Sequence, residues 1–186
     1  YLDMPFQHIS DPVLKKMNRK ITRKEIEATM ARVRRKLPDV AWRTTFIVGF
    51  PTETDQDFEE LVDFVSEGHF QHLGIFLYSD EDNIRSSKFG DPIPLSLKEE
   101  RKNRLMEIQQ KISREHHQKM VGSLQQVLVG GFSSETDLLL EGRNQYQGPE
   151  VDGVVYINEG NATSAGFHQV EITEAHEYDL VGKILN

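Results

Sequence analysis

The pattern of hydrophobic and polar positions changes once along the chain, near residue 117. Before that point, helical periods alternate with short apolar runs; after it, short apolar runs are separated by glycines. Alternating strands and helices predict parallel β/α units. About five short strands in the remaining stretch predict a small closed barrel of the OB type. We therefore expect an α/β region over residues 1–121 followed by an all-β domain over residues 122–186.

The first region reads as strand-then-helix units. Three apolar runs rich in β-branched and aromatic residues predict strands, and N-cap residues mark the helix starts. Three strands are too few to close an eight-stranded barrel, so the sequence predicts part of a larger one. The expected strands are 1–7, 42–48 and 73–78, and the expected helices start at Asp11–Pro12, at Thr54 and at capping boxes led by Thr22 and Ser96.

The second region has strand signals without helical periodicity. Glycines lie between the apolar runs, as in small barrels whose strands turn sharply. The expected strands are 124–129, 137–141, 153–157, 169–173 and 179–184.

Charge and composition exclude several classes of protein. The chain has a net charge of −8 and no cysteine, so these residues can form no disulfide scaffold and no Cys-ligated zinc or iron–sulfur site. No apolar stretch approaches the roughly 20 residues that span a bilayer. Residues 118–186 hold three basic and ten acidic residues, a net charge of −7. That balance argues against a general nucleic-acid binder.

Polar side chains at predicted strand ends are the strongest candidates for chemistry. Gln7 and His8 lie on or just after the first strand. Arg43 and Thr45 alternate along the second strand, so both face one side. β/α barrels place ligands at the C-terminal ends of their strands. The alternative is structural: Arg43 can pair with an acidic neighbour, and the Gly49–Pro51 turn can serve only to cap strand and helix.

Two other groups are weaker candidates for metal binding. His69 and His72 have helical spacing but no evident third ligand, so we interpret them as surface or packing residues. The acidic run at 80–83 lacks the spacing of a calcium loop, so we interpret it as a solvated loop.

Several motifs in order resemble the methylthiotransferases of the radical S-adenosylmethionine superfamily. The resemblance extends over nearly the whole chain, and its second part resembles the TRAM domain of that family. The matching stretches are YLDMPFQH (1–8), LKKMNR (14–19), RTTFIVGFPTET (43–54), FLYS (76–79), EGR (141–143), GPEVDG (148–153) and YDLVG (178–182).

The resemblance implies a fold and a reaction. It implies the C-terminal part of a radical SAM β/α barrel, a partial TIM-like barrel, followed by a five-stranded TRAM barrel. The stretch Pro5-Phe6-Gln7-His8 is similar to the branch that modifies ribosomal protein. That branch adds a methylthio group to the β-carbon of one Asp of small-subunit ribosomal protein twelve, in the cytoplasm. The alternative is a transfer-RNA-modifying member in which this piece docks RNA.

The cofactors implied are S-adenosylmethionine and two four-iron four-sulfur clusters. Because the family holds both clusters with cysteines, those cysteines would lie upstream of Tyr1, and we expect this fragment alone to be inactive. Carried over residue by residue, the resemblance implies S-adenosylmethionine contacts at Gln7, His8, Arg43 and Thr45. Arg43 is the candidate for the donor's carboxylate, because a guanidinium binds a carboxylate bidentately.

The acidic tail suggests the partner. Ribosomal proteins are generally basic, and a basic protein is attracted to an acidic surface that repels RNA phosphates. We therefore expect Glu135, Asp137, Glu141 and Glu150 to dock the ribosomal protein and RNA binding to be weak. The alternative is that these acids only keep a small barrel in solution.

Overall fold

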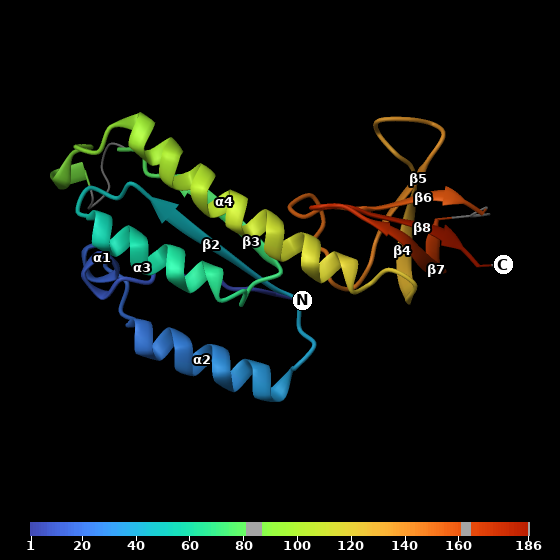
Figure 1. Cartoon of the computed structure of the whole chain (residues 1–186), viewed down its shortest axis with the longest axis horizontal. Coiled ribbons are helices and arrows are strands. Elements are labelled where there is room, and N and C mark those ends of the chain that lie inside the picture. The colour runs from blue at the N-terminus through green and yellow to red at the C-terminus, as the bar shows by residue number, and fades with distance from the viewer. Residues whose placement is uncertain (81–86, 161–164, 186) are drawn as a thin grey trace. The chain divides into compact units, whose positions relative to one another are not determined.

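The computed structural model describes residues 1–80, 87–160 and 165–185, which form two compact units (Figure 1). One, here called the β/α unit, comprises Leu2–Gln109. The other, here called the barrel unit, comprises Gln110–Asn186 together with Tyr1. The domain boundary expected after residue 121 stays a prediction.

The β/α unit contains a parallel three-stranded sheet in the order β1-β2-β3. The predicted strand 42–48 is confirmed, and the first strand is shorter than the predicted 1–7. Pro5 has no N–H to donate to β2, and the Phe6 N–H donates to the Thr44 hydroxyl instead of a backbone carbonyl, so the ladder is interrupted after Asp3. The strands are β1 (Leu2–Asp3), β2 (Trp42–Val48) and β3 (His72–Leu77).

The helices at Thr22 and Thr54 start as the local signals predict, and two others differ. Asp11 was predicted to be an N-cap, but the N-cap is Ser10 and Asp11 is the first helical residue. At Thr22 and Thr54, both hydrogen bonds of a capping box are present. The box predicted at Ser96 is wrong: an N-cap there implies a helix from Leu97, but the helix begins two residues earlier, at Leu95. The Pro94 carbonyl already accepts from the N–H groups of Leu97 and Lys98. The helices are α1 (Asp11–Lys16), α2 (Arg23–Lys36), α3 (Asp55–Ser66), α4 (Leu95–Gln118) and a 3₁₀ turn at Ser87–Phe89.

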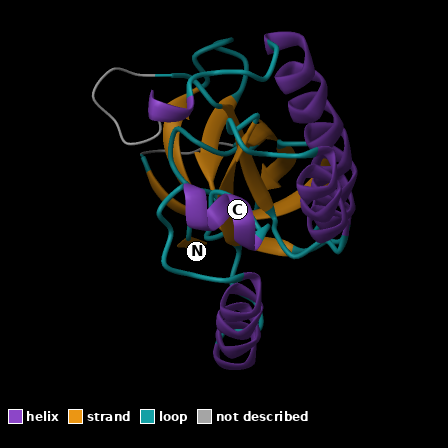
Figure 2. Ribbon diagram, turned by 90° about the vertical axis from the view of Figure 1, so that its left-hand side faces the viewer, coloured by secondary structure: helices purple, strands orange, loops and turns teal. Residues whose placement is uncertain are grey.

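One face of β2 forms the core of the β/α unit. Residues alternate along the strand, so Trp42, Phe46 and Val48 are buried on one face. Helices α2, α3 and α4 all contribute side chains to this core, and they lie outside the strands (Figure 2). The rings of Phe64 and Phe70 meet Phe46 edge to face. The other face of β2 therefore remains open for polar residues.

The barrel unit is a closed five-stranded barrel, as predicted, with strand order β4-β5-β6-β8-β7. Its core is small and aliphatic, built around Val127, Val155 and Ile172. The second strand starts later than the predicted 137–141. The strands are β4 (Leu124–Phe132), β5 (Leu140–Arg143), β6 (Val155–Glu159), β7 (Gly166–Ala175) and β8 (Leu180–Ile184).

Two glycines of the motifs EGR (141–143) and GPEVDG (148–153) lie where a larger residue would not fit. A Cβ on Gly153 would lie 1.9 Å from the Tyr178 carbonyl oxygen, and one on Gly142 would lie 2.7 Å from the Leu128 carbonyl oxygen. Closing so small a barrel brings backbones together at these points, and only glycine leaves room.

None of the helices in the described residues is both long enough and apolar enough to cross a membrane.

Candidate functional site

The open face of the sheet is built around Arg43 and Thr45 on β2. Thr45 pairs in register with Gly74 on β3, and Arg43 pairs with Asp3 on one side and His72 on the other. A Cβ at Gly74 would lie 3.2 Å from the Arg43 guanidinium and 3.5 Å from the Thr45 hydroxyl. The absence of a side chain at Gly74 therefore leaves space beside both polar groups.

Arg43 is held by an acidic neighbour on the same face. Its Nη1 lies 3.3 Å from Oδ2 of Asp3, and the side chains are 15% and 45% exposed. The pairing that the sequence left open is thus present. The Nη2 of Arg43 lies on the Gly74 side, 3.2 Å from where a Cβ of that residue would be.

Gln7 follows β1 by four residues and is hydrogen-bonded to β2. Its N–H donates to the Thr45 carbonyl at 2.8 Å, and its own carbonyl accepts from the Ile47 N–H at 2.9 Å. Its φ of 73° is unusual for a residue with a side chain and costs on the order of 1 kcal/mol. The structure thus brings the backbone of Gln7 beside Thr45.

His8 lies elsewhere: it is fully buried, so it lies apart from the open face. Its Nδ1 accepts a hydrogen bond from the Ser10 N–H at 3.0 Å, which leaves the proton of the neutral ring on Nε2. Burial lowers the pKa of His8 to about 4, and Arg101 adds to the lowering while Asp57 opposes it. His8 is therefore neutral at pH 7.

Asp57 joins the turn after β1 to the start of α3. It accepts hydrogen bonds from the Ser10 hydroxyl and from the hydroxyl and N–H of Thr54, at 2.6 and 2.9 Å for Thr54. Hydrogen bonds to the charged form stabilise a carboxylate. Although burial opposes it, the net pKa of Asp57 is lowered, chiefly by Ser10 and Thr54.

Glu53 is a second buried carboxylate, and it accepts hydrogen bonds in the turn after β2. It accepts from the N–H groups of Gly49 and Phe50, and its Oε1 lies 3.2 Å from the Arg101 guanidinium. Both side chains are buried, at 0% exposed for Glu53 and 4% for Arg101. Burial raises the pKa of Glu53 to about 7, although Arg101 and the two N–H groups lower it. The turn at the end of β2 is therefore tied to α4 by a buried ion pair.

Lys98 lies three residues before Arg101 on α4 and packs against the same turn after β2. Its Nζ donates to the Tyr78 carbonyl at 2.8 Å and to Asp91 at 2.6 Å. A Cβ at Gly49, which has a φ of 75°, would lie 2.3 Å from the Lys98 side chain. Gly49 is thus required by both its conformation and the lysine packed against it.

The sequence reasoning missed this buried network. A signal was present: Arg101 lies four residues after Leu97 and four before Leu105, on the stripe of α4 that faces the core. A cation on an apolar stripe predicts a buried acidic partner. Nothing in the local pattern shows that the partner is Glu53.

The predicted docking acids of the barrel unit are only partly brought together. Burial raises the pKa of Tyr156 on β6, and the negative charges of Asp179, Glu135 and Glu141 add to this rise. Glu141 pairs in register with Tyr156. Asp137 and Glu150 are exposed, and Glu150 has a φ of 65° in the turn before β6.

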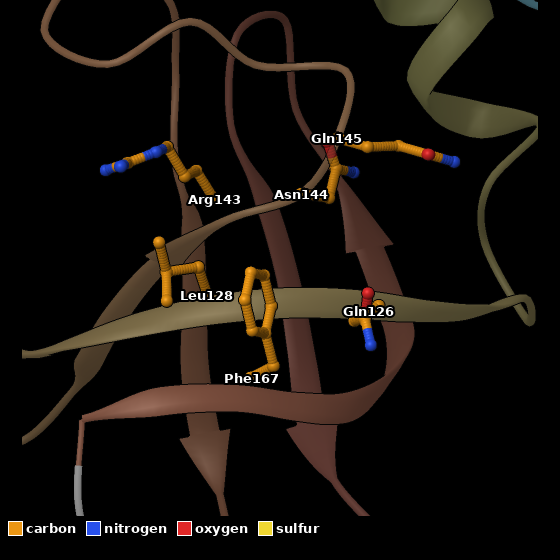
Figure 3. Close-up of a pocket in the computed structure, with 6 residues that line it drawn as sticks. All are labelled: Gln126, Leu128, Arg143, Asn144, Gln145 and Phe167. Carbon is orange, nitrogen blue, oxygen red and sulfur yellow. The ribbon is translucent and has the colours of Figure 1, made fainter.

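A groove of about 480 Å³ lies on the outer face of the barrel. Figure 3 shows the Phe167 ring beside Leu128 on neighbouring strands, with Asn144 on the loop that follows β5. No sequence pattern predicted it, because its residues come from three strands. Its lining comprises Gln126, Leu128, Arg143, Asn144, Gln145 and Phe167.

The candidates for metal binding find no support as sites. His69 lies 2.6 Å from Glu67, and nowhere in the described residues do three potential ligands gather around one point. Most of the acidic run at 80–83 lies outside the described residues.

Comparisons with known proteins match both units. Residues 1–65 match the radical SAM superfamily, and residues 121–185 match the TRAM domain. The chain is 51% identical over its whole length to a protein of Bdellovibrio bacteriovorus, named ribosomal protein uS12 methylthiotransferase RimO, and covers 40% of it. Proteins of the same name in Geobacter sulfurreducens and Geotalea uraniireducens are each 44% identical over the whole chain, which covers 42% and 41% of them. The chain thus spans about two fifths of these relatives.

Proposed function

Because this chain belongs to the radical S-adenosylmethionine methylthiotransferase family, we propose that it works as part of an enzyme that methylthiolates ribosomal protein uS12. The reaction proposed is the addition of a methylthio group to the β-carbon of an Asp of that protein, in the cytoplasm. The observation that carries the proposal is the 51% identity, over 185 residues of this chain, to a protein named for that substrate. Names of this kind favour the ribosomal protein over transfer RNA.

The chain's own part in the chemistry is to bind and position. S-adenosylmethionine and the iron–sulfur clusters supply the radical and sulfur chemistry in this family. The chain has no cysteine, so its residues do not fit either cluster and we assign none to it.

The open face of β2 fits the amino-acid end of S-adenosylmethionine. The Arg43 guanidinium is the partner for its carboxylate, and the Thr45 hydroxyl lies beside it above the space that Gly74 leaves. The amide of Gln7 is the third proposed contact. The ion pair with Asp3 helps to keep the guanidinium on this face of the sheet.

His8 takes a different role in this proposal. Its burial and its hydrogen bond from Ser10 favour a positioning role, in which it fixes the turn that carries Gln7. The buried carboxylates Asp57 and Glu53 support the two turns that follow β1 and β2 in the same way.

A chimaera tests the proposed function. The matching part of the Bdellovibrio relative is replaced by this chain, and the product is expressed in a bacterial strain that lacks its own enzyme. Mass spectrometry of uS12 should then reveal one added methylthio group. Unmodified uS12, with the chimaera folded and its clusters bound, would contradict the proposal.

Arg43→Lys in the chimaera tests the binding site. A lysine keeps the charge but cannot bind a carboxylate with two parallel hydrogen bonds, so S-adenosylmethionine should bind at least tenfold more weakly by calorimetry. Arg35→Lys, at an exposed position on α2, is the control. Unchanged affinity in Arg43→Lys would return Arg43 to a purely structural role.

A further inference from the structure

Positive charge in this chain is concentrated in one segment. Residues 12–36 hold ten basic and two acidic residues, a net charge of +8, whereas the other residues together have a net charge of −16. The segment runs from α1 through α2, within the β/α unit, and the acidic stretch 118–186 belongs to the barrel unit. The net charge of −8 therefore combines a basic segment with an acidic remainder, and the two act in opposite directions on a polyanion.

The outer face of α2 presents three of these cations to solvent. Helix α2 lies at the outside of the β/α unit (Figure 1) and buries Ile26 and Met30 in the core. Lys24, Arg32 and Arg35 are exposed, and the helical period places them together on the side opposite those apolar residues. We call these three side chains the basic face.

The fold uses other cations of α2 but not those of the basic face. Nε of Arg23 lies 2.8 Å from the Glu27 carboxylate, and the Arg34 guanidinium donates to two main-chain carbonyls at 2.8 and 2.7 Å. Among the described residues, no carboxylate lies within ion-pair distance of the basic face. Its charges are therefore available to an anion from outside this chain.

The helix itself explains only part of this charge. Cations in the last turn of a helix complement its dipole, which accounts for Arg35 and Lys36. Lys24 lies in the first turn, where the same dipole disfavours a cation. Arg32 has like charges three and four positions later, in Arg35 and Lys36, and such pairs destabilise a helix. A bound polyanion would offset both costs.

We propose that the basic face binds the phosphate backbone of RNA that adjoins uS12 in the ribosome. Lys24 and Arg35 are eleven residues apart, so the face extends about 16 Å along the helix axis. Guanidinium groups bind phosphate oxygens bidentately, and a lysine adds a point charge. Exposed Ala28 and Ala31 lie on the same side, and their short side chains let a phosphate backbone approach. This inference rests on the proposed function, because a ribosomal protein as substrate is what brings RNA to this surface.

The burial of the apolar side of α2 favours RNA over an anionic membrane. A basic helix that lies on a membrane inserts its apolar face into the lipid. In α2 that face, with Ile26 and Met30, already packs in the protein core. RNA requires only the charged face, since phosphate contacts supply essentially all of the affinity of sequence-independent binding.

Binding of a fluorescein-labelled RNA hairpin to the whole 186-residue chain tests the basic face. Lys24→Gln, Arg32→Gln and Arg35→Gln combined should weaken binding at least tenfold at low salt. The slope of log affinity against log salt should become shallower by about two to three, because each phosphate contact contributes roughly 0.7–0.9. Arg32→Gln alone should make the slope shallower by about one. Glutamine keeps a high helix propensity, so circular dichroism should show unchanged helix content.

A control variant removes the same amount of charge elsewhere. Arg104→Gln, Lys111→Gln and Lys119→Gln change exposed cations on α4 and just after it, and the net charge again falls by three. This variant should bind the hairpin nearly as tightly as the unmodified chain. Equal weakening by the two triple variants would show that overall charge, and not the basic face, controls binding, and would overturn the inference.

The outcomes separate the inference from the proposed function. If the unmodified chain does not bind the hairpin at low salt, the basic face is not an RNA site, and the chimaera experiment still decides the proposed function. If binding depends on the basic face but the chimaera leaves uS12 unmodified, the proposed function fails and the basic face stays an RNA site. Tighter binding to phosphatidylglycerol vesicles than to the hairpin, lost in the α2 triple variant, would assign the basic face to a membrane and overturn the inference.

Discussion

Replacing Arg101 by methionine should destabilise the β/α unit by about 3–5 kcal/mol at pH 8. The change leaves a side chain of similar length but removes the cation that faces Glu53, and both side chains of that pair are at least 96% buried. A buried charge deprived of its partner is costly, and total stabilities of about 5–15 kcal/mol make such a loss large.

The size of this loss should depend on pH in a direction that the structure determines. In the unmodified chain the folded pKa of Glu53, about 7, lies above its ordinary value of 4.5, so this group's contribution to stability falls as pH rises from about 4.5 to 7. Without Arg101 the folded pKa rises further. Near pH 6 Glu53 in the variant is therefore protonated and needs no cation, and the loss should be smaller than at pH 8.

Arg104 provides a matched control on the same helix. It also lies near the ring of Phe58, at 5.6 Å against 5.2 Å for Arg101. Its ion pair with Glu59 is about half exposed, with side chains 46% and 52% accessible, so Arg104→Met should cost no more than about 1 kcal/mol.

Urea unfolding followed by tryptophan fluorescence measures the stability of the β/α unit, in which both substitutions lie. Trp42 is the single tryptophan of the chain, and it lies fully buried in the core of the β/α unit. Equal losses for Arg101→Met and Arg104→Met, or a loss for Arg101→Met that does not change between pH 6 and pH 8, would refute the assignment of a buried, titratable pair.

Three further predictions concern His8, the barrel and the clusters. Because the folded pKa of His8, about 4, lies below its ordinary 6.5, its contribution to stability falls as pH drops. The stability advantage of the unmodified chain over His8→Gln should therefore shrink by about 2 kcal/mol between pH 7 and pH 5, by the same fluorescence assay; parallel curves would contradict this. Gly153→Ala should destabilise the barrel by at least about 1–3 kcal/mol, because its Cβ would meet the Tyr178 carbonyl, whereas Gly130→Ala, with its nearest atom at 3.9 Å, should not. Hydrogen exchange of β6 and β8 peptides measures the difference, and equal protection in the two variants would disprove it. Finally, anaerobic reconstitution of this chain with iron and sulfide should give no cluster absorbance, because it has no cysteine; a stoichiometric cluster would be the contrary result.

The sequence by itself determined the features that depend on neighbouring residues. The capping box at Thr22 and the helix start at Thr54 each depend on residues within four positions, so the pattern predicted both correctly. Strand β2 was predicted with its observed bounds because its alternation is uninterrupted from Trp42 to Val48. Glycine spacing and short apolar runs likewise predicted a closed five-stranded barrel. The placement of Arg43 and Thr45 on one face followed from the period of a strand alone.

Tertiary structure decided what depends on residues far apart in the chain. The burial of His8 follows from contacts that no local pattern contains. Glu53 and Arg101 are 48 positions apart, and only the packing of α4 on the turn after β2 makes them an ion pair. The groove exists because Leu128 on β4 pairs in register with Arg143 on β5 and with Phe167 on β7. Burial and register are properties of the assembled chain, and they decide which of its charged and aromatic residues stay available to a ligand.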